Sequence, residues 1–146
     1  LKTVSLRYFN VFGPRQDPHG EYAAAIPKFI DLISHGKSPI IYGDGMQTRD
    51  FTYIDNVVQA NINAAKYVDV TGVFNVACGS KITVNELAYD LMKIIGNNVD
   101  IIYKPPRPGD ILHSLSDITK AKNAFGYEPI TSIKDGLKET IAWFQN

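Results

Sequence analysis

The chain has 146 residues, of which 45% are hydrophobic and 21% are charged, so it can form one ordinary domain with a real core. Its formal net charge is zero, which leaves no overall field to attract nucleic acid or an anionic membrane surface. There is no membrane-length apolar run and no signal peptide, and the single cysteine excludes an internal disulfide. We expect a protein of the reducing cytoplasm with neither nucleic-acid nor membrane partners.

The first expected element is a strand over residues 4–8, where Val4, Leu6 and Tyr8 alternate with Ser5 and Arg7. Glycine and proline at positions 13 and 14 end it. The chain lacks an initiating methionine and opens on a core strand. We therefore expect a fragment of a longer protein, and a first strand that belongs to the missing part.

Helices and strands then alternate. Apolar residues at helical spacing predict a helix from Ile26 that stops at Gly36, with Pro27 in its first turn. Further strands are expected at residues 40–42, 49–54, 73–77 and 99–103. Further helices are expected at residues 55–65, 83–95, 117–125 and 132–144. This alternation, without repeats or low-complexity linkers, predicts an α/β fold.

Two of these helices have defined starts. Thr83 and Glu86 fit a capping box. Asp55 is the expected N-cap of the other helix, which carries Val58, Ile62 and Ala65 on its apolar face.

Motifs that carry chemistry are scarce. No glycine-rich dinucleotide fingerprint is present, because Gly43-Asp44-Gly45 leads into no suitable helix. The three histidines do not stand at metal-ligand spacing, so no metal site is expected. Cys78 lies among small apolar residues and is expected to be a buried side chain rather than a reactive thiol. These motifs alone assign no reaction.

Four blocks carry a family resemblance: LRYFNVFGPR at residues 6–15, IYGDG followed by TRDFTYID within 41–55, FNVA at 74–77, and RPGD at 107–110. In order and spacing they resemble the extended short-chain dehydrogenases of the NAD-dependent epimerase/dehydratase family. The likeness covers essentially the whole chain. The wording of the first block is similar to UDP-glucose and UDP-N-acetylglucosamine 4-epimerases.

The resemblance implies the C-terminal part of a Rossmann-type nucleotide-sugar epimerase. Residues 1–12 would end the NAD-binding domain with the last strand of its parallel sheet. Residues 13–146 would form the small substrate-binding region, with some segments packing back on that sheet. NAD would be bound mainly by the missing half, and the intact protein would be a homodimer.

The family's catalytic Tyr-x-x-x-Lys also lies upstream of this segment. Tyr89 and Lys93 have that spacing, but their helix is amphipathic with Leu91 and Ile94 as core positions. No catalytic residue is therefore expected here, and the fragment alone is expected to be inactive.

The resemblance implies polar contacts to a UDP-sugar. Asn10 would hold a phosphate or sugar oxygen, and Asp110 would accept from ribose hydroxyls. Arg49 and Arg107 would close on the diphosphate, since guanidinium groups supply bidentate donors. The structural alternatives are a turn-forming asparagine, an N-cap-like aspartate and surface ion pairs of little energetic weight.

The resemblance also implies apolar and sugar contacts. Ala25, Ile26, Phe29 and Tyr42 would approach the uracil, although the first three equally form a helix stripe. Tyr8 and Phe9 would flank the nicotinamide, with core packing as the rival interpretation. Gln16 would reach the sugar, unless it only belongs to a polar loop. Ser114 would form the wall beside the sugar C2 substituent, where a small residue leaves room for an N-acetyl group, or else would be a capping hydroxyl.

The implied reaction is NAD-dependent inversion at C4 of UDP-glucose or UDP-galactose, extended by Ser114 to N-acetylated sugars. Within the family, a nucleotide-sugar 4,6-dehydratase or a UDP-glucuronate decarboxylase is the alternative. In another class, these 146 residues would be a non-catalytic nucleotide-sugar-binding module.

Overall fold

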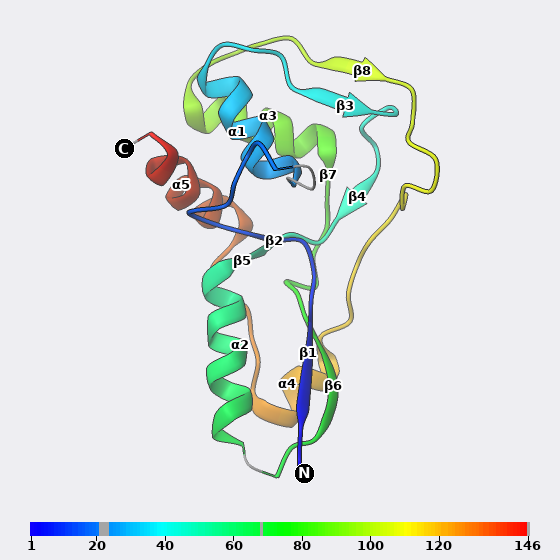
Figure 1. The fold of residues 1–146 in the computed structure, drawn as a ribbon, viewed down its shortest axis with the longest axis vertical. Helices are drawn as coiled ribbons and strands as arrows, with labels where there is room; N and C mark the ends of the chain where they lie inside the picture. The colour runs from blue at the N-terminus through cyan, green and yellow to red at the C-terminus, as the bar shows by residue number, and fades with distance from the viewer. Residues whose placement is uncertain (21–23, 68, 146) are drawn as a thin grey trace.

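The computed structural model describes residues 1–20, 24–67 and 69–145. Figure 1 shows two regions joined end to end along the long axis. The lower region contains β1 (Val4–Tyr8), β6 (Gly72–Val76), α2 (Ile54–Lys66) and α4 (Thr119–Phe125). The upper region contains α1 (Ala25–Ser34), α3 (Val84–Ile95), α5 (Ile133–Phe144), β3 (Ile40–Tyr42), β8 (Ile102–Lys104), β4 (Thr48–Arg49) and β7 (Ile82–Thr83). Between the two regions, β2 (Val11–Phe12) pairs with β5 (Thr52–Tyr53).

The lower region is built on a parallel pair of strands. β1 and β6 run in register from Val4 opposite Gly72 to Tyr8 opposite Val76. One edge of the first strand is therefore paired within the chain, and its assignment to a cofactor-binding domain stays a prediction. Beneath the pair lies a small apolar cluster of Val57, Ala60, Phe74, Val76, Ala121, Phe125 and Tyr127. This region confirms the predicted α/β class with parallel strands.

The upper region has the larger core, formed where α1 packs against α3 and α5 packs against both. Ile30, Ile33, Leu87, Leu91 and Leu137 are all fully buried there. The helix boundaries follow from local sequence. The predicted capping box of Thr83 and Glu86 is present, with both reciprocal hydrogen bonds, and Gly96 ends α3 in the left-handed conformation.

The strand predicted at residues 49–54 is wrong, because it divides into β4 and β5, which belong to different sheets. Asp50 causes the break. Its side chain is fully buried, and its carboxylate accepts hydrogen bonds from the backbone N–H groups of Cys78 at 2.9 Å and Gly79 at 3.0 Å. A side chain committed to another loop pulls its backbone out of a continuous ladder.

The helix after β5 also differs from expectation. Tyr53, not Asp55, occupies the N-cap, and Asp55 lies in the first turn, where its charge still suits the helix dipole. The predicted apolar face is exposed: Val58 is 49% and Ile62 43% accessible. The buried face instead carries Asn56, whose amide oxygen accepts from two backbone N–H groups at residues 130 and 131.

Two other boundaries moved by a few residues. The last predicted strand is found as β8, and the helix predicted from residue 117 begins at Thr119 as α4. Within the described residues, no helix is long and apolar enough to cross a membrane. Those same residues contain no group of three or more metal-binding side chains.

Candidate functional site

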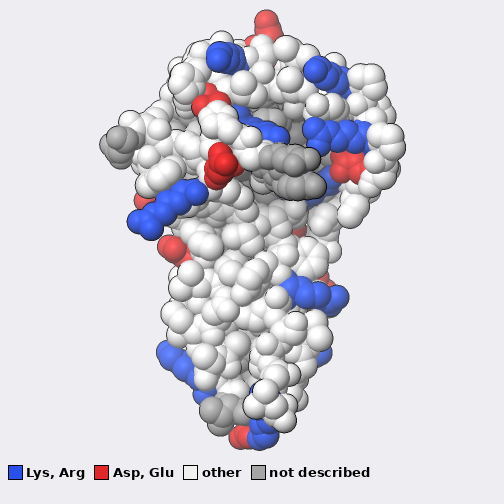
Figure 2. Space-filling view, in the orientation of Figure 1, with Lys and Arg blue, Asp and Glu red and all other residues white. Residues whose placement is uncertain are grey.

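The upper region is hollowed by a cavity of about 570 Å³ between α1, β3 and the segment that follows β8. Figure 2 shows this hollow with Lys and Arg side chains gathered at its rim. Most of the residues that the sequence singled out for a sugar nucleotide line it: Asn10, Ala25, Ile26, Phe29, Tyr42, Arg49, Arg107 and Asp110. The structure thus brings together residues up to 100 positions apart in the sequence.

The loop at residues 105–112 forms one side of the cavity and is tethered at both ends. At its start, β8 pairs in parallel with β3, so that Lys104 lies opposite Tyr42. At its end, Thr48 donates its N–H to the Leu112 carbonyl at 2.8 Å and accepts from the Ser114 N–H at 3.0 Å. These tethers hold the arginine and aspartate of the loop over the cavity.

The turn that follows β3 is fixed by the start of α3. Asn85 donates its side-chain amide to the Asp44 carbonyl at 3.0 Å and its backbone N–H to the Gly45 carbonyl. Gly45 has a φ of +76°, and a Cβ there would lie 2.0 Å from the Asn85 side chain. Only glycine satisfies both conditions. The turn therefore sets where Tyr42 and Arg49 stand relative to each other.

Arg107 reaches the cavity edge by stacking on an aromatic ring. Its guanidinium carbon lies 3.8 Å from the centroid of the Tyr42 ring. A hydrogen bond from Arg107, followed by the Arg107 charge, lowers the pKa of the Tyr42 phenol, and the charges of Lys104 and Lys28 act in the same direction. Arg107 makes no ion pair with the described residues. Apart from its contact with Tyr42, the Arg107 guanidinium thus remains open to an anionic ligand.

Arg49 is more occupied. One of its nitrogens lies 2.6 Å from an Asp110 carboxylate oxygen, and another donates to the backbone carbonyls of Thr48 and Ile111. The pair is partly shielded from solvent, with the Arg49 side chain 17% and the Asp110 side chain 35% accessible. Arg49 thus fastens the loop in addition to lining the cavity. Sequence reasoning had treated the two arginines as equivalent.

Asn10 lies just past the C-terminal end of β1, as expected. Its φ of 39° is in the left-handed region, where asparagine is tolerated better than most residues. Its side-chain amide nitrogen donates to the Asp50 carbonyl at 3.0 Å. The amide oxygen is the part that remains to meet a ligand.

The apolar wall of the cavity comes from α1. Ile26 and Phe29 line the cavity but are 1% and 5% accessible, so most of their surface serves the core. Ala25 is half-buried, and Tyr42 supplies the aromatic surface opposite α1. Contact of these residues with a uracil stays a prediction.

Four predicted residues lie outside the described lining of the cavity: Tyr8, Phe9, Gln16 and Ser114. Tyr8 is half-exposed, and its hydroxyl donates to Asn61 at 3.0 Å. Gln16 donates to the Val11 carbonyl. Ser114 is half-buried beside Thr48. Their roles towards sugar and cofactor stay predictions.

Sequence reasoning missed the polar cluster around Asp50. Burial raises the pKa of this carboxyl, against the lowering effect of its backbone N–H donors from Cys78, Ser116 and Gly79. Burial, followed by the Asp50 charge, also raises the pKa of the Cys78 thiol. Cys78 is half-buried rather than fully buried, and its raised pKa disfavours the reactive thiolate form. The arginine-aspartate pair in the sequence gave no sign that the aspartate turns inward.

Comparison with known proteins identifies the family of this chain. The model of the NAD dependent epimerase/dehydratase family matches residues 1–77, more than half of the chain. The chain belongs to this family. A provisionally named UDP-glucose 4-epimerase from Methanocaldococcus jannaschii is 42% identical over the whole chain, which covers 47% of that protein. A UDP-N-acetyl-alpha-D-glucosaminuronate decarboxylase and a dTDP-D-glucose 4,6-dehydratase are also similar to this chain.

Two solved structures show the same fold at high similarity. The UDP-glucose 4-epimerase of Thermotoga maritima, determined with UDP-glucose, is 45% identical with a TM-score of 0.94. The UDP-N-acetylglucosamine 4-epimerase of Methanobrevibacter ruminantium, determined with UDP-N-acetylmuramic acid, is 46% identical with a TM-score of 0.94. Each match covers 99% of this chain and 46% of the other. The chain thus spans about half the length of the relatives it matches and corresponds to their C-terminal part.

Proposed function

We propose that the chain is the substrate-binding part of an NAD-dependent UDP-sugar 4-epimerase, acting on UDP-glucose and UDP-galactose and extending to N-acetylated sugars. The observation that carries the proposal is the meeting of Arg49, Arg107, Asp110 and Asn10 on one cavity that also has an apolar wall. A nucleoside diphosphate sugar needs this combination: fixed cations for the diphosphate, acceptors for hydroxyls and a flat apolar surface for the base.

Each residue has a separate task in this proposal. Arg107 donates to the diphosphate from the loop side, while its Tyr42 partner supports the base. Arg49 holds the loop through Asp110 and presents the rest of its guanidinium to the same diphosphate. Asp110 can accept from ribose hydroxyls with the carboxylate oxygen that does not face Arg49. The Asn10 amide oxygen accepts from a sugar hydroxyl.

The site must bind the nucleotide tightly and leave the sugar free to turn. Epimerisation at C4 requires the sugar to present opposite faces after oxidation, so binding energy belongs at the diphosphate and base. The cavity is consistent with this demand, because backbone hydrogen bonds tether the end of the loop that carries Arg107 and Asp110, and the apolar wall belongs to helix α1. In this reaction NAD accepts and returns the hydride. Solved relatives include a UDP-glucose 4-epimerase of Thermus thermophilus in complex with NAD.

The described residues are suited to only a small part of an NAD site. Tyr8 is 49% accessible and ends β1, at the edge of a parallel sheet where ligands bind. Phe9 follows it and is half-buried. Both would line the nicotinamide, whereas the described residues hold no glycine-rich turn for the dinucleotide phosphates. Within this proposal residues 1–12 extend the cofactor domain, and β6 joins them in its sheet.

Calorimetric titration of the protein with UDP, UDP-glucose and ADP tests the binding proposal. UDP and UDP-glucose are expected to bind in the micromolar range, with ADP at least about tenfold weaker, a difference of about 1.4 kcal/mol. Equal affinity for UDP and ADP would contradict a built uridine site.

Product analysis by NMR on the full-length protein tests the reaction. Interconversion of UDP-glucose and UDP-galactose is expected. A 4-keto-6-deoxy sugar would establish the dehydratase instead, and a pentose formed from UDP-glucuronate would establish the decarboxylase. Light scattering on the same sample tests the homodimer, which stays a prediction.

A further inference from the structure

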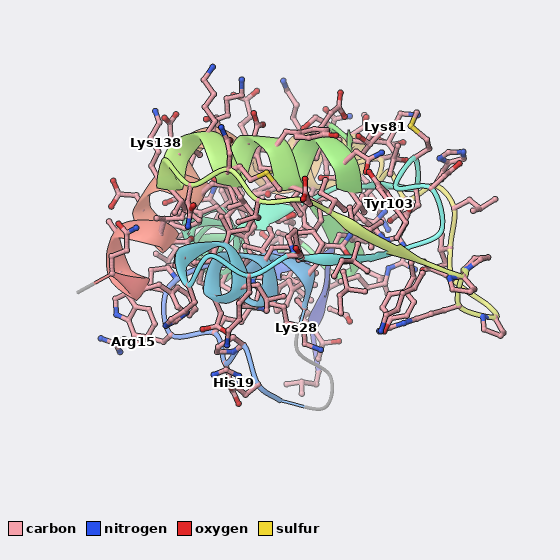
Figure 3. The ribbon with its side chains drawn as sticks, turned by 90° about the horizontal axis from the view of Figure 1, so that it is seen from above. Arg15, His19, Lys28, Lys81, Tyr103 and Lys138 are labelled. Carbon is pink, nitrogen blue, oxygen red and sulfur yellow. The ribbon has the colours of Figure 1, made fainter. Side chains whose placement is uncertain are left out.

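Lys28 is a cation that sequence reasoning passed over. It belongs to the first turns of α1, lines the cavity and is only half-buried. Figure 3 shows it on the side of α1 that faces away from α3. The neighbours of Lys28 on the helix, Pro27 and Phe29, are buried and serve the core, so its side chain is the polar one that α1 contributes to this wall.

The surroundings of Lys28 are unfavourable for a cation in the free protein. No ion pair joins it to any described residue. The first turn of α1 holds no acidic residue, and the positive end of a helix dipole disfavours an added positive charge. A hydrogen bond and the charge of Arg107, together with the charges of Lys104 and Lys28, lower the pKa of the Tyr42 phenol, so the region around this ring is positive. Such a local conflict is typical of a site that awaits an anion.

The charge of the cavity supports this interpretation. Its described lining contains three cations, Lys28, Arg49 and Arg107, and one carboxylate, Asp110. Asp110 neutralises Arg49 directly at 2.6 Å. Among the described residues that line the cavity, Lys28 and Arg107 are therefore the two cations without an ion-pair partner. A diphosphate ester carries one negative charge on each phosphate near neutral pH, so these two cations match it in number.

We propose that Lys28 binds the diphosphate of the ligand and, together with Arg107, supplies its main charge compensation, while Arg49 serves first as the anchor of the loop. This inference rests on the proposed function and deepens it. The long flexible stem of lysine suits the task, because an ammonium acts as a point charge and does not need the fixed geometry of a guanidinium.

The test is a calorimetric comparison of UDP-glucose with uridine, which lacks the phosphates. Lys28→Met keeps the length and helical preference of the side chain but removes its charge. It should weaken UDP-glucose binding about tenfold, the size expected for a hydrogen bond to a charged group. Uridine affinity should stay within about twofold, and Lys28→Arg should restore most of the UDP-glucose affinity. The loss should shrink at high salt, because partly exposed charges are screened.

Lys37→Met is the matched control, because Lys37 is exposed beyond the end of α1 and outside the lining of the cavity. It should change neither affinity. Unchanged UDP-glucose binding in Lys28→Met, or an equal loss for uridine and UDP-glucose, would overturn the assignment of Lys28 and leave the uridine site intact. Failure of the unsubstituted protein to bind UDP-glucose would overturn the proposed function as well.

Discussion

The two regions of the molecule differ in the size of their cores and in where their exposed apolar side chains lie. The upper region closes a core between three helices and still leaves a charged cavity. The lower region rests on two parallel strands and exposes Tyr8, Val58, Ile62 and Val73 by 43–49%. Parallel sheets are normally covered on both faces and contain more strands than two. The cavity thus lies in the region with the larger core, although that region also exposes large apolar side chains, by 57–70% at Met46, Tyr89, Ile111 and Leu112.

A polar joint connects the two regions. Asp50 accepts from the loop after β6 and, at 3.4 Å, from the backbone N–H of Ser116. Its backbone carbonyl meets Asn10, and its neighbour Arg49 carries the loop of the cavity. The end of the sheet and the ligand cavity are therefore held in register through one residue. Under the proposed function, this joint would place a sugar in the cavity against a cofactor that the described residues do not enclose.

The largest expected change in stability distinguishes the buried core of the upper region from the exposed apolar face of α2. Leu91 is fully buried in the upper core, so Leu91→Ala should cost about 2–5 kcal/mol of unfolding free energy. Ile62→Ala on α2 should cost less than about 1 kcal/mol in this chain, because that side chain is 43% accessible. Urea unfolding measures both.

The substitutions Leu91→Ala and Ile62→Ala test the comparison of the two regions more sharply when they are made in the full-length protein. If another part of the full-length protein covers α2, Ile62→Ala becomes a core substitution and its cost should rise towards that of Leu91→Ala. An equally small cost of Ile62→Ala in both forms would show that α2 is a true outer surface.

The next effect concerns ligand binding in the upper region alone. Arg107→Ala should weaken UDP affinity about tenfold to a hundredfold, because hydrogen bonds to charged groups contribute about 1.5–3 kcal/mol. Lys120→Ala removes a cation from the lower region, where Lys120 lies over Phe74, and should leave UDP affinity unchanged. Calorimetry compares the two variants, and an equal loss in both would mean that UDP senses overall charge rather than a built cavity.

Arg49→Ala should differ in kind from Arg107→Ala. It removes the anchor of Asp110 and of the Ile111 carbonyl, so hydrogen exchange over residues 107–112 should accelerate even without ligand. The Arg107 variant should leave that exchange as it is.

The polar joint should respond to pH. Burial raises the pKa of Asp50 in the folded protein above its unfolded value of about 3.9, so stability linked to this group is lost as pH rises through the folded pKa. Asp50→Asn does not titrate, and at neutral pH should cost about 1–3 kcal/mol because its amide cannot serve all the backbone donors. The advantage of the native residue over asparagine should therefore be larger at pH 4 than at pH 7.

Chemical unfolding at several pH values checks this trend. Asp69→Asn, which removes an exposed partner of Lys2, is the control and should cost less than about 1 kcal/mol at neutral pH. A constant difference between Asp50 and its asparagine variant from pH 4 to 7 would contradict the raised pKa.

The smallest effect concerns sugar choice. Ser114 is small and half-buried, and we predict that the full-length enzyme accepts UDP-N-acetylglucosamine as well as UDP-glucose. Ser114→Tyr should lower kcat/KM for the acetylated substrate at least about tenfold more than for UDP-glucose, since a single steric change in a pocket is worth about that much. A parallel fall for both substrates would remove Ser114 from the wall beside the sugar.

Much of the fold could be predicted because its signals are local. The helix stripe of Ile26, Phe29 and Ile30 and the capping box at Thr83 depend only on neighbours in the sequence, and both are confirmed. The family resemblance located the residues that line the cavity. Pairing of β1 with β6 depends on a contact across 68 positions, which periodicity cannot show.

Buried polar residues account for most of the errors. Asp50 and Asn56 have polar side chains but are fully buried. Backbone hydrogen bonds from distant loops offset the cost of burying each of them. Asp50 divided a predicted strand, and Asn56 turned α2 so that its apolar stripe faces outward. The sequence did not single out Lys28, because a lysine within a helix pattern is usually a solvated surface residue. Only the structure shows that it lines the cavity.

A crystal structure of the protein with UDP tests the central claim most directly. The account predicts the diphosphate between Arg107, Lys28 and Arg49. It places the uracil against Ala25 and Tyr42, and a ribose hydroxyl within hydrogen-bond distance of Asp110. A UDP molecule bound elsewhere, with Arg107 still stacked on Tyr42 and turned away from the phosphates, would contradict it.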